Sequence, residues 1–169
     1  MVDKNQVFEI GENVIITDRI QILSITPEQA KKIKSLRIEN QEIDFEFDDF
    51  FSSKFNGRDL DSLYFINCEM NYTFLYDISS SKLGCINCAL TSYHARSCLG
   101  SISRWDYIET LDLSQNKFGE DAETFYSWMW KSVFGCVSIK NLILSDNGFS
   151  EEWEKKIVSS FGKCTSLII

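Results

Sequence analysis

The sequence predicts an α/β solenoid in which short parallel strands stack side by side and are joined by helices or irregular turns. The first observation is a strong internal repeat, because the pattern of residues 108–118 returns at residues 139–149. The second is a series of weaker copies on both sides of this pair. The third is that the segments between the copies carry helix signals. A single copy cannot bury its own apolar face, so neighbouring copies must stack around one core.

The two strong copies fit the pattern L-x-x-L-x-L-x-x-N-x-L, with Ile and Phe standing in for some of the leucines. Asn116 and Asn147 hold the Asn position, where a side-chain amide can satisfy backbone groups that no strand partner reaches. This pattern resembles that of leucine-rich repeats, and the longer units are closest to the ribonuclease-inhibitor-like subtype. The resemblance covers residues 33–169. It implies a parallel sheet along a concave face, helices or turns on the convex side, and ligands that commonly bind the concave face.

Weaker copies extend the array to about six rungs, the last of them truncated. The first strand leucines of these rungs are Leu36, Leu63, Leu83, Leu111, Leu142 and Leu167. Their separations are 27, 20, 28, 31 and 25 residues, so the unit of 20 is too short for more than one helical turn. Cys68 and Cys88 take the Asn position in two rungs, and we expect them to be buried neighbours.

Before the rungs, residues 1–32 are expected to form a β-rich N-terminal cap on the repeat array of residues 33–169. Three apolar runs rich in β-branched residues occur there, at residues 7–10, 14–16 and 20–25. Polar turn residues separate the runs, so we interpret them as two or three strands that cover the first rung. Leu23 lies only 13 residues before Leu36, which is too close for another repeat.

Helix signals occupy the connecting segments. The expected helices lie near residues 26–33, 48–55, 121–134 and 150–162. Thr26 is a suitable N-cap for the first of them and is followed by proline at the first helical position. Ser150 is a suitable N-cap for the last, in which Trp153, Ile157 and Phe161 recur at every fourth residue.

Composition and charge exclude several classes of function. Hydrophobic residues make up 44% of the 169 residues, which is enough for a buried core, and no apolar run is long enough to span a membrane. The net charge of −8 argues against nucleic acid, because phosphate binding needs clustered Lys and Arg. An acidic surface favours basic partners, and it also simply keeps a protein in solution. We therefore expect a protein partner, no nucleic acid and no membrane insertion.

The six cysteines raise the question of a metal or redox site. The N-terminal residues do not resemble a secretory signal, so we expect reduced thiols in the cytoplasm or another reducing intracellular compartment. Cys85, Cys88, His94 and Cys98 could form a zinc set, and Cys85 with Cys88 alone could form a redox pair. The repeat register instead gives Cys85 a core-facing strand position and Cys88 the turn position. Buried structural thiols are the preferred interpretation, with no metal site and no cofactor.

No catalytic arrangement is expected, so the chain is not predicted to be an enzyme. His94 is the only histidine, and the sequence has neither a nucleophile elbow nor a phosphate-binding loop. Acidic clusters at residues 44–49 and 120–123 fall at expected helix starts, where the helix dipole favours negative charge. Trp128 and Trp130 diverge by about 200° on a helix, so one of them should be exposed or covered by a partner.

The predicted function is a non-catalytic protein–protein interaction module that binds through the concave sheet face. Strand residues that flank the core positions point outward, and the middle ones form the column Arg37, Tyr64, Gly84, Asp112, Ile143 and Ile168. Ile66, Ile86 and Ser114 are expected to point outward beside this column. The predicted partner-binding residues are Arg37, Tyr64, Ile66, Ile86, Asp112, Ile143 and Ile168. An apolar patch is expected around Tyr64, Ile66 and Ile86.

The alternative is a structural subunit of a larger assembly, which contacts its neighbours through the solenoid ends. The sequence stops at residue 169, directly after a strand begins. A final parallel strand leaves unpaired N–H and C=O groups on one side, where another strand can add. We expect self-association through this C-terminal edge, weakened by a charged residue in place of Ile168.

Overall fold

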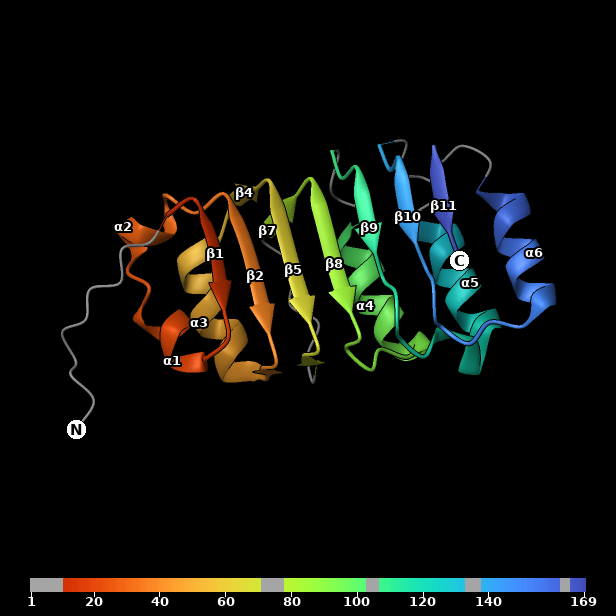
Figure 1. The fold of residues 1–169 in the computed structure, drawn as a ribbon, viewed down its shortest axis with the longest axis horizontal. Coiled ribbons are helices and arrows are strands. Elements are labelled where there is room, and N and C mark those ends of the chain that lie inside the picture. The colour runs from red at the N-terminus through yellow and green to blue at the C-terminus, as the bar shows by residue number, and fades with distance from the viewer. Residues whose placement is uncertain (1–10, 71–77, 103–106, 133–137, 162–164) are drawn as a thin grey trace.

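A computed structural model describes residues 11–70, 78–102, 107–132, 138–161 and 165–169, which form an α/β fold around a parallel sheet of seven strands (Figure 1). The strands lie in chain order: β1 (Asn13–Ile16), β2 (Ser35–Glu39), β5 (Ser62–Ile66), β8 (Lys82–Ile86), β9 (Thr110–Asp112), β10 (Asn141–Ile143) and β11 (Ser166–Ile168). Figure 1 shows the larger helices behind the sheet. No described helix crosses the side of the sheet that faces the viewer.

The strands of this main sheet are paired residue for residue in one continuous register. The predicted strand leucines are Cα partners from one strand to the next: Leu36, Leu63, Leu83, Leu111, Leu142 and Leu167. The predicted register of all six strands is therefore confirmed. Val14 of β1 pairs with Leu36 and adds a seventh member to the same row.

Helices precede or connect the strands. They are α1 (Arg19–Ser24), α2 (Pro27–Ala30), α3 (Phe45–Phe55), α4 (Ser92–Ile102), the 3-10 helix η1 (Phe118–Asp121), α5 (Ala122–Ser132) and α6 (Glu151–Ser160). The predicted N-cap Thr26 is confirmed and forms a capping box with Gln29, because Thr26 Oγ1 accepts from Gln29 N at 3.2 Å and Gln29 Oε1 accepts from Thr26 N at 2.9 Å. The predicted N-cap Ser150 of α6 is confirmed as well. Within the described residues, no helix is long and apolar enough to cross a membrane.

Two small parallel sheets flank the N-terminal half of the main sheet, and the sequence does not predict them. One pairs β3 (Glu42–Ile43) with β6 (Glu69–Met70), and the other pairs β4 (Arg58–Leu60) with β7 (Ile78–Ser80). Arg58 ties the second sheet to the chain after α2, because its guanidinium donates to the carbonyl oxygens of Lys31 and Ile33 at 3.0 and 3.1 Å. Such short strands leave no alternating pattern in a sequence.

The N-terminal segment differs from the prediction of two or three strands. Residues 14–16 do form a strand within β1, but the strand prediction for residues 20–25 is wrong, because α1 occupies most of that run. Asp18 begins the helix by accepting a hydrogen bond from Ile20 N at 2.9 Å. Ile22 faces the core, whereas Ile20 is 71% exposed. The run at residues 7–10 lies outside the described residues.

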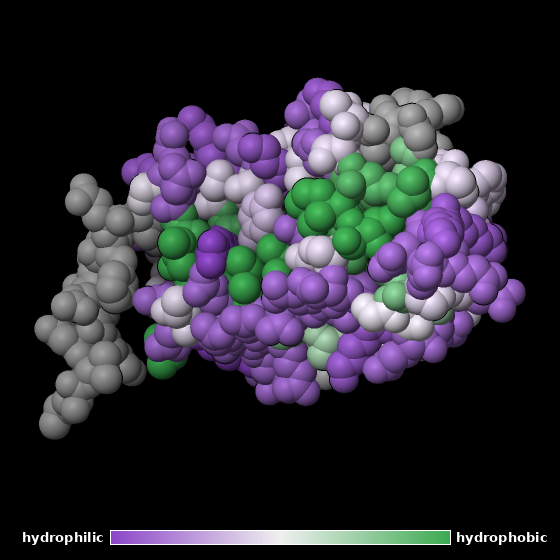
Figure 2. Space-filling view, turned by 45° about the vertical axis from the view of Figure 1, so that its right-hand side comes forward, coloured by the Kyte–Doolittle hydropathy of each residue, from purple (hydrophilic) through white to green (hydrophobic). Residues whose placement is uncertain are grey.

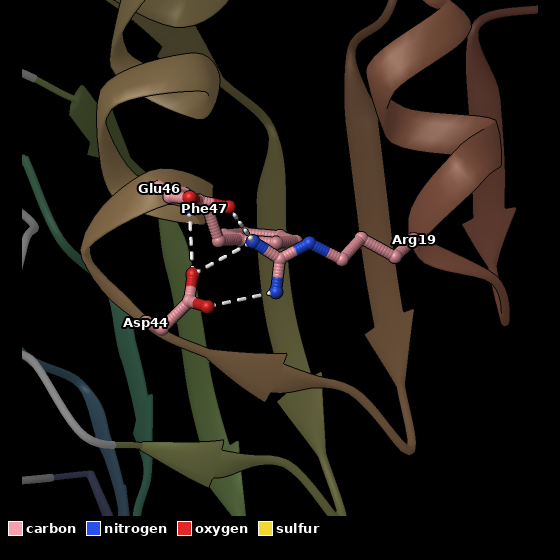
Figure 3. Close-up of polar contacts among 4 residues, drawn as sticks. All are labelled: Arg19, Asp44, Glu46 and Phe47. Carbon is pink, nitrogen blue, oxygen red and sulfur yellow. Dashed lines mark hydrogen bonds and ion pairs between the residues drawn. The ribbon is translucent and has the colours of Figure 1, made fainter.

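Arg19 joins α1 to the start of α3. Its Nη1 and Nη2 atoms each donate to one carboxylate oxygen of Asp44 at 2.9 Å, and Glu46 accepts from Nη2 at 3.4 Å (Figure 3). Asp44 also caps α3 by accepting from Phe47 N at 2.8 Å. The hydrogen bonds from Arg19, followed by the one from Phe47, lower the pKa of Asp44. This acidic cluster is therefore a helix start, as predicted.

One hydrophobic core lies between the main sheet and the helices. Phe47, Phe51 and Phe55 of α3 stack with centroid distances of 5.8 and 4.7 Å along the helix. Phe51 also meets Phe65 of β5 edge-on at 6.4 Å. All four side chains are essentially inaccessible to solvent, so α3 is fixed against the sheet by aromatic packing.

After four of the strands the chain turns at an equivalent place, which we call the turn position. It is held by Cys68, Cys88, Asn116 and Asn147. Asn116 Nδ2 donates to Cys85 O of the preceding rung at 2.7 Å and to Ser114 O of its own rung at 3.0 Å. The Cys88 thiol donates in the same way to Phe65 O at 3.5 Å. The residues with positive φ directly before the turn positions, and before Gln41 in the first rung, are Asn40, Asn67, Asn87, Gln115 and Asp146.

Candidate interaction surface

The outward residues of the main sheet form the candidate surface, which we call the sheet face. Its middle column is continuous across all seven strands: Ile15, Arg37, Tyr64, Gly84, Asp112, Ile143 and Ile168. The predicted column is therefore confirmed in its register. Ile15 is absent from the predicted set, although the alternation of Val14, Ile15 and Ile16 already places it outward.

Tyr64 covers the centre of the sheet face. Its ring lies over Gly84, because a Cβ atom placed on Gly84 would come within 2.2 Å of Tyr64 Cδ1. Gly84 holds its predicted place in the outward column, but the tyrosine ring buries it. Burial raises the pKa of Tyr64, and the negative charge of Asp112 raises it further. The tyrosine thus lies across β8 and approaches β9.

Polar side chains beside the column are held by their neighbours. Asp112 Oδ1 accepts from Ser114 N at 3.0 Å and from Ser114 Oγ at 2.7 Å. Ser114 is buried by this arrangement, so its predicted outward position does not leave it exposed. Arg37 forms an ion pair with Glu39 on the same strand. Arg37 and Asp112 thus each interact with a residue two positions further along the chain.

Apolar side chains dominate both ends of the column. Ile15 is 63% exposed and Ile168 is 48% exposed, whereas Ile143 is half-buried. Figure 2 shows hydrophobic residues gathered at the C-terminal end of the sheet, with polar residues around them. Ile66 and Ile86 are Cα partners and are half-buried beside Tyr64. An apolar patch with a polar border is a common form of protein-binding surface.

The cysteines take structural positions in the fold. Cys68 and Cys88 are buried neighbours, as predicted, and each is 2% exposed. A hydrogen bond from Cys88 lowers the pKa of Cys68 to about 7, against the opposing effect of burial. Within the described residues, no three His, Cys, Asp or Glu side chains lie close enough together to hold a metal ion. The side chain of Cys98, a member of the zinc set considered above, lies outside the described residues.

His94 has a local structural contact at the start of α4. Its Nδ1 atom accepts a hydrogen bond from Thr91 N at 3.1 Å, so it caps the first turn of the helix. Partial burial lowers the pKa of His94. A neutral imidazole suits this acceptor role, because a protonated Nδ1 could not accept the bond.

Trp128 and Trp130, two residues apart on α5, diverge as predicted. Trp128 is partly buried against the core, whereas Trp130 is 56% exposed. Trp130 stacks with Tyr126 at a centroid distance of 6.3 Å, and Tyr126 contacts Trp153 of α6 at 5.7 Å. These rings form a second aromatic surface that is carried by helices rather than by the main sheet.

No model of a known protein family matches the chain, and no curated protein matches it either. The proposals for function therefore rest on the residues and surfaces of this chain.

Proposed function

We propose that the chain is a leucine-rich-repeat solenoid that acts as a non-catalytic interaction module and binds a protein partner through the sheet face. The repeat assignment is supported by seven parallel strands in chain order, by their unbroken register, and by the shared turn position. Its buried thiols favour a reducing intracellular compartment.

The observation that carries the proposal is the column on the sheet face. Exposed isoleucines lie at its two ends, and an oriented arginine, tyrosine and aspartate lie between them. Aromatic and arginine side chains in fixed positions are enriched among the residues that contribute most to protein binding. An apolar patch that crosses several strands is more than the sheet needs for its own stability, because these side chains point away from the core.

Site-specific crosslinking tests this proposal. A photoreactive residue at position 143, on the sheet face, is compared with one at position 158, where Val158 is 55% exposed on α6. We expect position 143 to capture a protein partner that position 158 does not capture. The Kd for that partner should then rise about tenfold or more in Ile143→Ala and Arg37→Ala, and should stay unchanged in Val158→Ala.

Stability measurements on the same variants separate binding from folding. Ile143→Ala and Arg37→Ala should keep a free energy of unfolding within about 1 kcal/mol of the wild type, because both residues lie outside the core. A partner that crosslinks equally at both positions, or whose affinity falls only as far as the fold is destabilised, would contradict the proposed surface.

The second candidate function is assembly through β11. Ile168 is exposed on this last strand of the described sheet, and Leu167 and Ile169 beside it are only half-buried. An exposed strand edge can pair with another chain. Sedimentation velocity at rising concentration should then show self-association that Ile168→Lys weakens. A wild-type chain that stays monomeric at every concentration tested would remove this candidate.

A further inference from the structure

Two asparagines of the sequence directly precede a glycine: Asn56 precedes Gly57, and Asn147 precedes Gly148. In such a pair the backbone nitrogen of the glycine can attack the side-chain amide carbon of the asparagine. Glycine favours this attack because it has no Cβ to hinder the approach and because it tolerates the backbone rotation that the approach needs. The structure places the two pairs in opposite environments, so their reactivity should differ.

Asn56 and Gly57 lie in the exposed turn between α3 and β4. The backbone N–H of Asn56 donates to Ser52 O at 2.8 Å, but none of the described residues forms a hydrogen bond with the Asn56 side-chain amide. The ψ of Asn56 is 131°, which holds the Gly57 nitrogen away from that amide, so the peptide between them must rotate before it can react. Gly57 permits this rotation, because even a Cβ placed there would meet no described atom within 4 Å.

Asn147 is held in place by its surroundings. Its side chain is only 4% exposed, and Nδ2 donates to Leu113 O and Leu144 O at 3.0 and 2.7 Å. Gly148 packs against the backbone of the preceding rung, since a Cβ placed on Gly119 would lie 2.1 Å from Gly148 O. Reaction at Asn147 therefore requires this turn to open first, which costs free energy that an exposed turn does not need.

We propose that Asn56 is a site of spontaneous deamidation and that the fold protects Asn147 from the same reaction. The Gly57 nitrogen forms a bond to Asn56 Cγ, the bond from Cγ to the amide nitrogen breaks, and the proton of the Gly57 nitrogen leaves with the amide nitrogen as ammonia. The product is a succinimide ring. Water then opens this ring at either carbonyl, so position 56 becomes aspartate or isoaspartate without any oxidant or reductant.

Either product changes the connection between α3 and β4. A carboxylate at position 56 lies at the C-terminal end of α3, where the helix dipole disfavours negative charge. Isoaspartate also routes the main chain through the side chain and so lengthens the link to β4. Arg58 begins that strand, and its guanidinium donates to the carbonyl oxygens of Lys31 and Ile33 at 3.0 and 3.1 Å. Modification of Asn56 should therefore loosen the tie between β4 and the chain after α2.

Incubation of the full chain at mildly alkaline pH tests the proposal, because base removes the proton of the attacking nitrogen. The water is enriched in heavy oxygen, and peptide mapping by mass spectrometry follows its incorporation at each asparagine–glycine pair. In the folded chain Asn56 should react more than about tenfold faster than Asn147, because Asn147 reacts only when its turn opens. In the urea-unfolded chain the two sites should react at similar rates, since the same dipeptide then controls both.

Two variants separate the chemistry from its effect on the fold. Asn56→Gln has a longer side chain that cannot close the same ring, so its melting temperature should stay constant during the incubation. Asn56→Asp carries the charge of one product on an unchanged main chain. It should lower the melting temperature of fresh protein by less than complete modification of the wild type does, because the wild type also accumulates isoaspartate.

An Asn56 that stays intact in the folded chain while it reacts in the unfolded chain would overturn the proposal. Equal rates at Asn56 and Asn147 in the folded chain would overturn it as well. A modified wild type that keeps its melting temperature would contradict the expected loosening at β4. The test needs no partner, so its outcome is independent of the proposed binding through the sheet face.

Discussion

The two halves of the main sheet share one register but close their turns with different side chains. In the C-terminal half, the Asn116 amide satisfies five backbone groups. Its Oδ1 accepts from Cys88 N and Leu90 N at 3.0 and 3.1 Å, and its Nδ2 donates to three carbonyl oxygens. One buried residue therefore completes the hydrogen bonds of two successive rungs.

In the N-terminal half, cysteines and asparagines together form the hydrogen bonds of the turns. The thiols of Cys68 and Cys88 donate to the carbonyl oxygens inside the turn. Outside it, Asn67 Nδ2 donates to Asn40 Oδ1 at 3.3 Å, and Asn87 Nδ2 donates to Asn67 Oδ1 at 2.8 Å. In the other half Gln115 and Asp146 hold the equivalent positions, and among the described residues the ladder of asparagine side chains ends at Asn87.

The comparison separates what every turn needs from what only some turns have. Each turn needs a donor that points at the carbonyl oxygens of its own and the preceding rung, and either a thiol or an amide supplies it. A left-handed residue must precede that donor, and asparagine adopts this conformation readily. The strong acceptor of the Asn116 amide is an addition that the cysteine turns do not have.

The largest expected effect tests whether the two halves share one core. Leu63→Ala and Leu142→Ala remove equivalent, fully buried side chains from the same row. Each should lower the free energy of unfolding by about 2–5 kcal/mol, because a cavity remains. Urea denaturation measures both. A much smaller loss for Leu63→Ala would mean that the N-terminal half does not unfold together with the other half.

The next effect lies in the amide turns. Asn116→Ala leaves several buried backbone groups without a partner and should cost about 3 kcal/mol or more. Asn147→Ala should cost about half as much, because Asn147 Nδ2 also donates to three carbonyl oxygens but its buried Oδ1 accepts no hydrogen bond from the residues that the structure describes. Equal losses in urea denaturation would show that the acceptor contacts of Asn116 contribute little.

A smaller loss is expected in the cysteine turns. Cys88→Ala should lower the free energy of unfolding by about 1–2 kcal/mol, because a thiol makes weaker hydrogen bonds than an amide. The variant also removes the main cause of the low pKa of Cys68. The pKa of Cys68 is about 7 in the folded state, below its ordinary value of 9.0. The ionised thiol therefore contributes fully to the free energy of unfolding above pH 9, and this contribution is lost as the pH falls to 7.

The pH dependence gives Cys88→Ala its control. From pH 7 to pH 9 the free energy of unfolding of the wild type should rise relative to that of Cys88→Ala. Cys68→Ala lacks the titrating thiol, so it should not show this rise. Chemical denaturation at the two pH values measures this difference. A gain that survives in Cys68→Ala would have to come from another titrating group.

The sequence predicts the register of the main sheet well. Each strand leucine lies in a short repeat that also contains the other core residues and the turn residue of its rung, so the repeats align with one another. It fails at residues 20–25, where β-branched composition suggests a strand but the Asp18 cap and the spacing of Ile22 and Ile25 produce a helix. Composition is thus a weaker guide than a cap together with helical spacing.

The sheet face is predictable in its register but not in its exposure. Alternation along a strand shows which way a side chain points. It does not show that the Tyr64 ring covers Gly84 or that Asp112 binds Ser114, because those contacts depend on side-chain rotamers and, for Tyr64, cross between rungs. The asparagine ladder does have a sequence signal, since Asn40, Asn67 and Asn87 are spaced like the leucines of the first rungs.

The smallest expected effect distinguishes the two roles of that ladder. Asn67 has a φ of 54° and also bonds to the asparagines on both sides. Asn67→Ala removes the amide and strains the left-handed turn, so it should cost about 1 kcal/mol. Asn67→Gly removes the amide but relieves the conformation. If the backbone conformation dominates, the glycine variant should match the wild type within about 0.5 kcal/mol, since exposed hydrogen bonds contribute little. A loss in Asn67→Gly as large as that in Asn67→Ala would instead assign the stability of the N-terminal turns to the amide ladder.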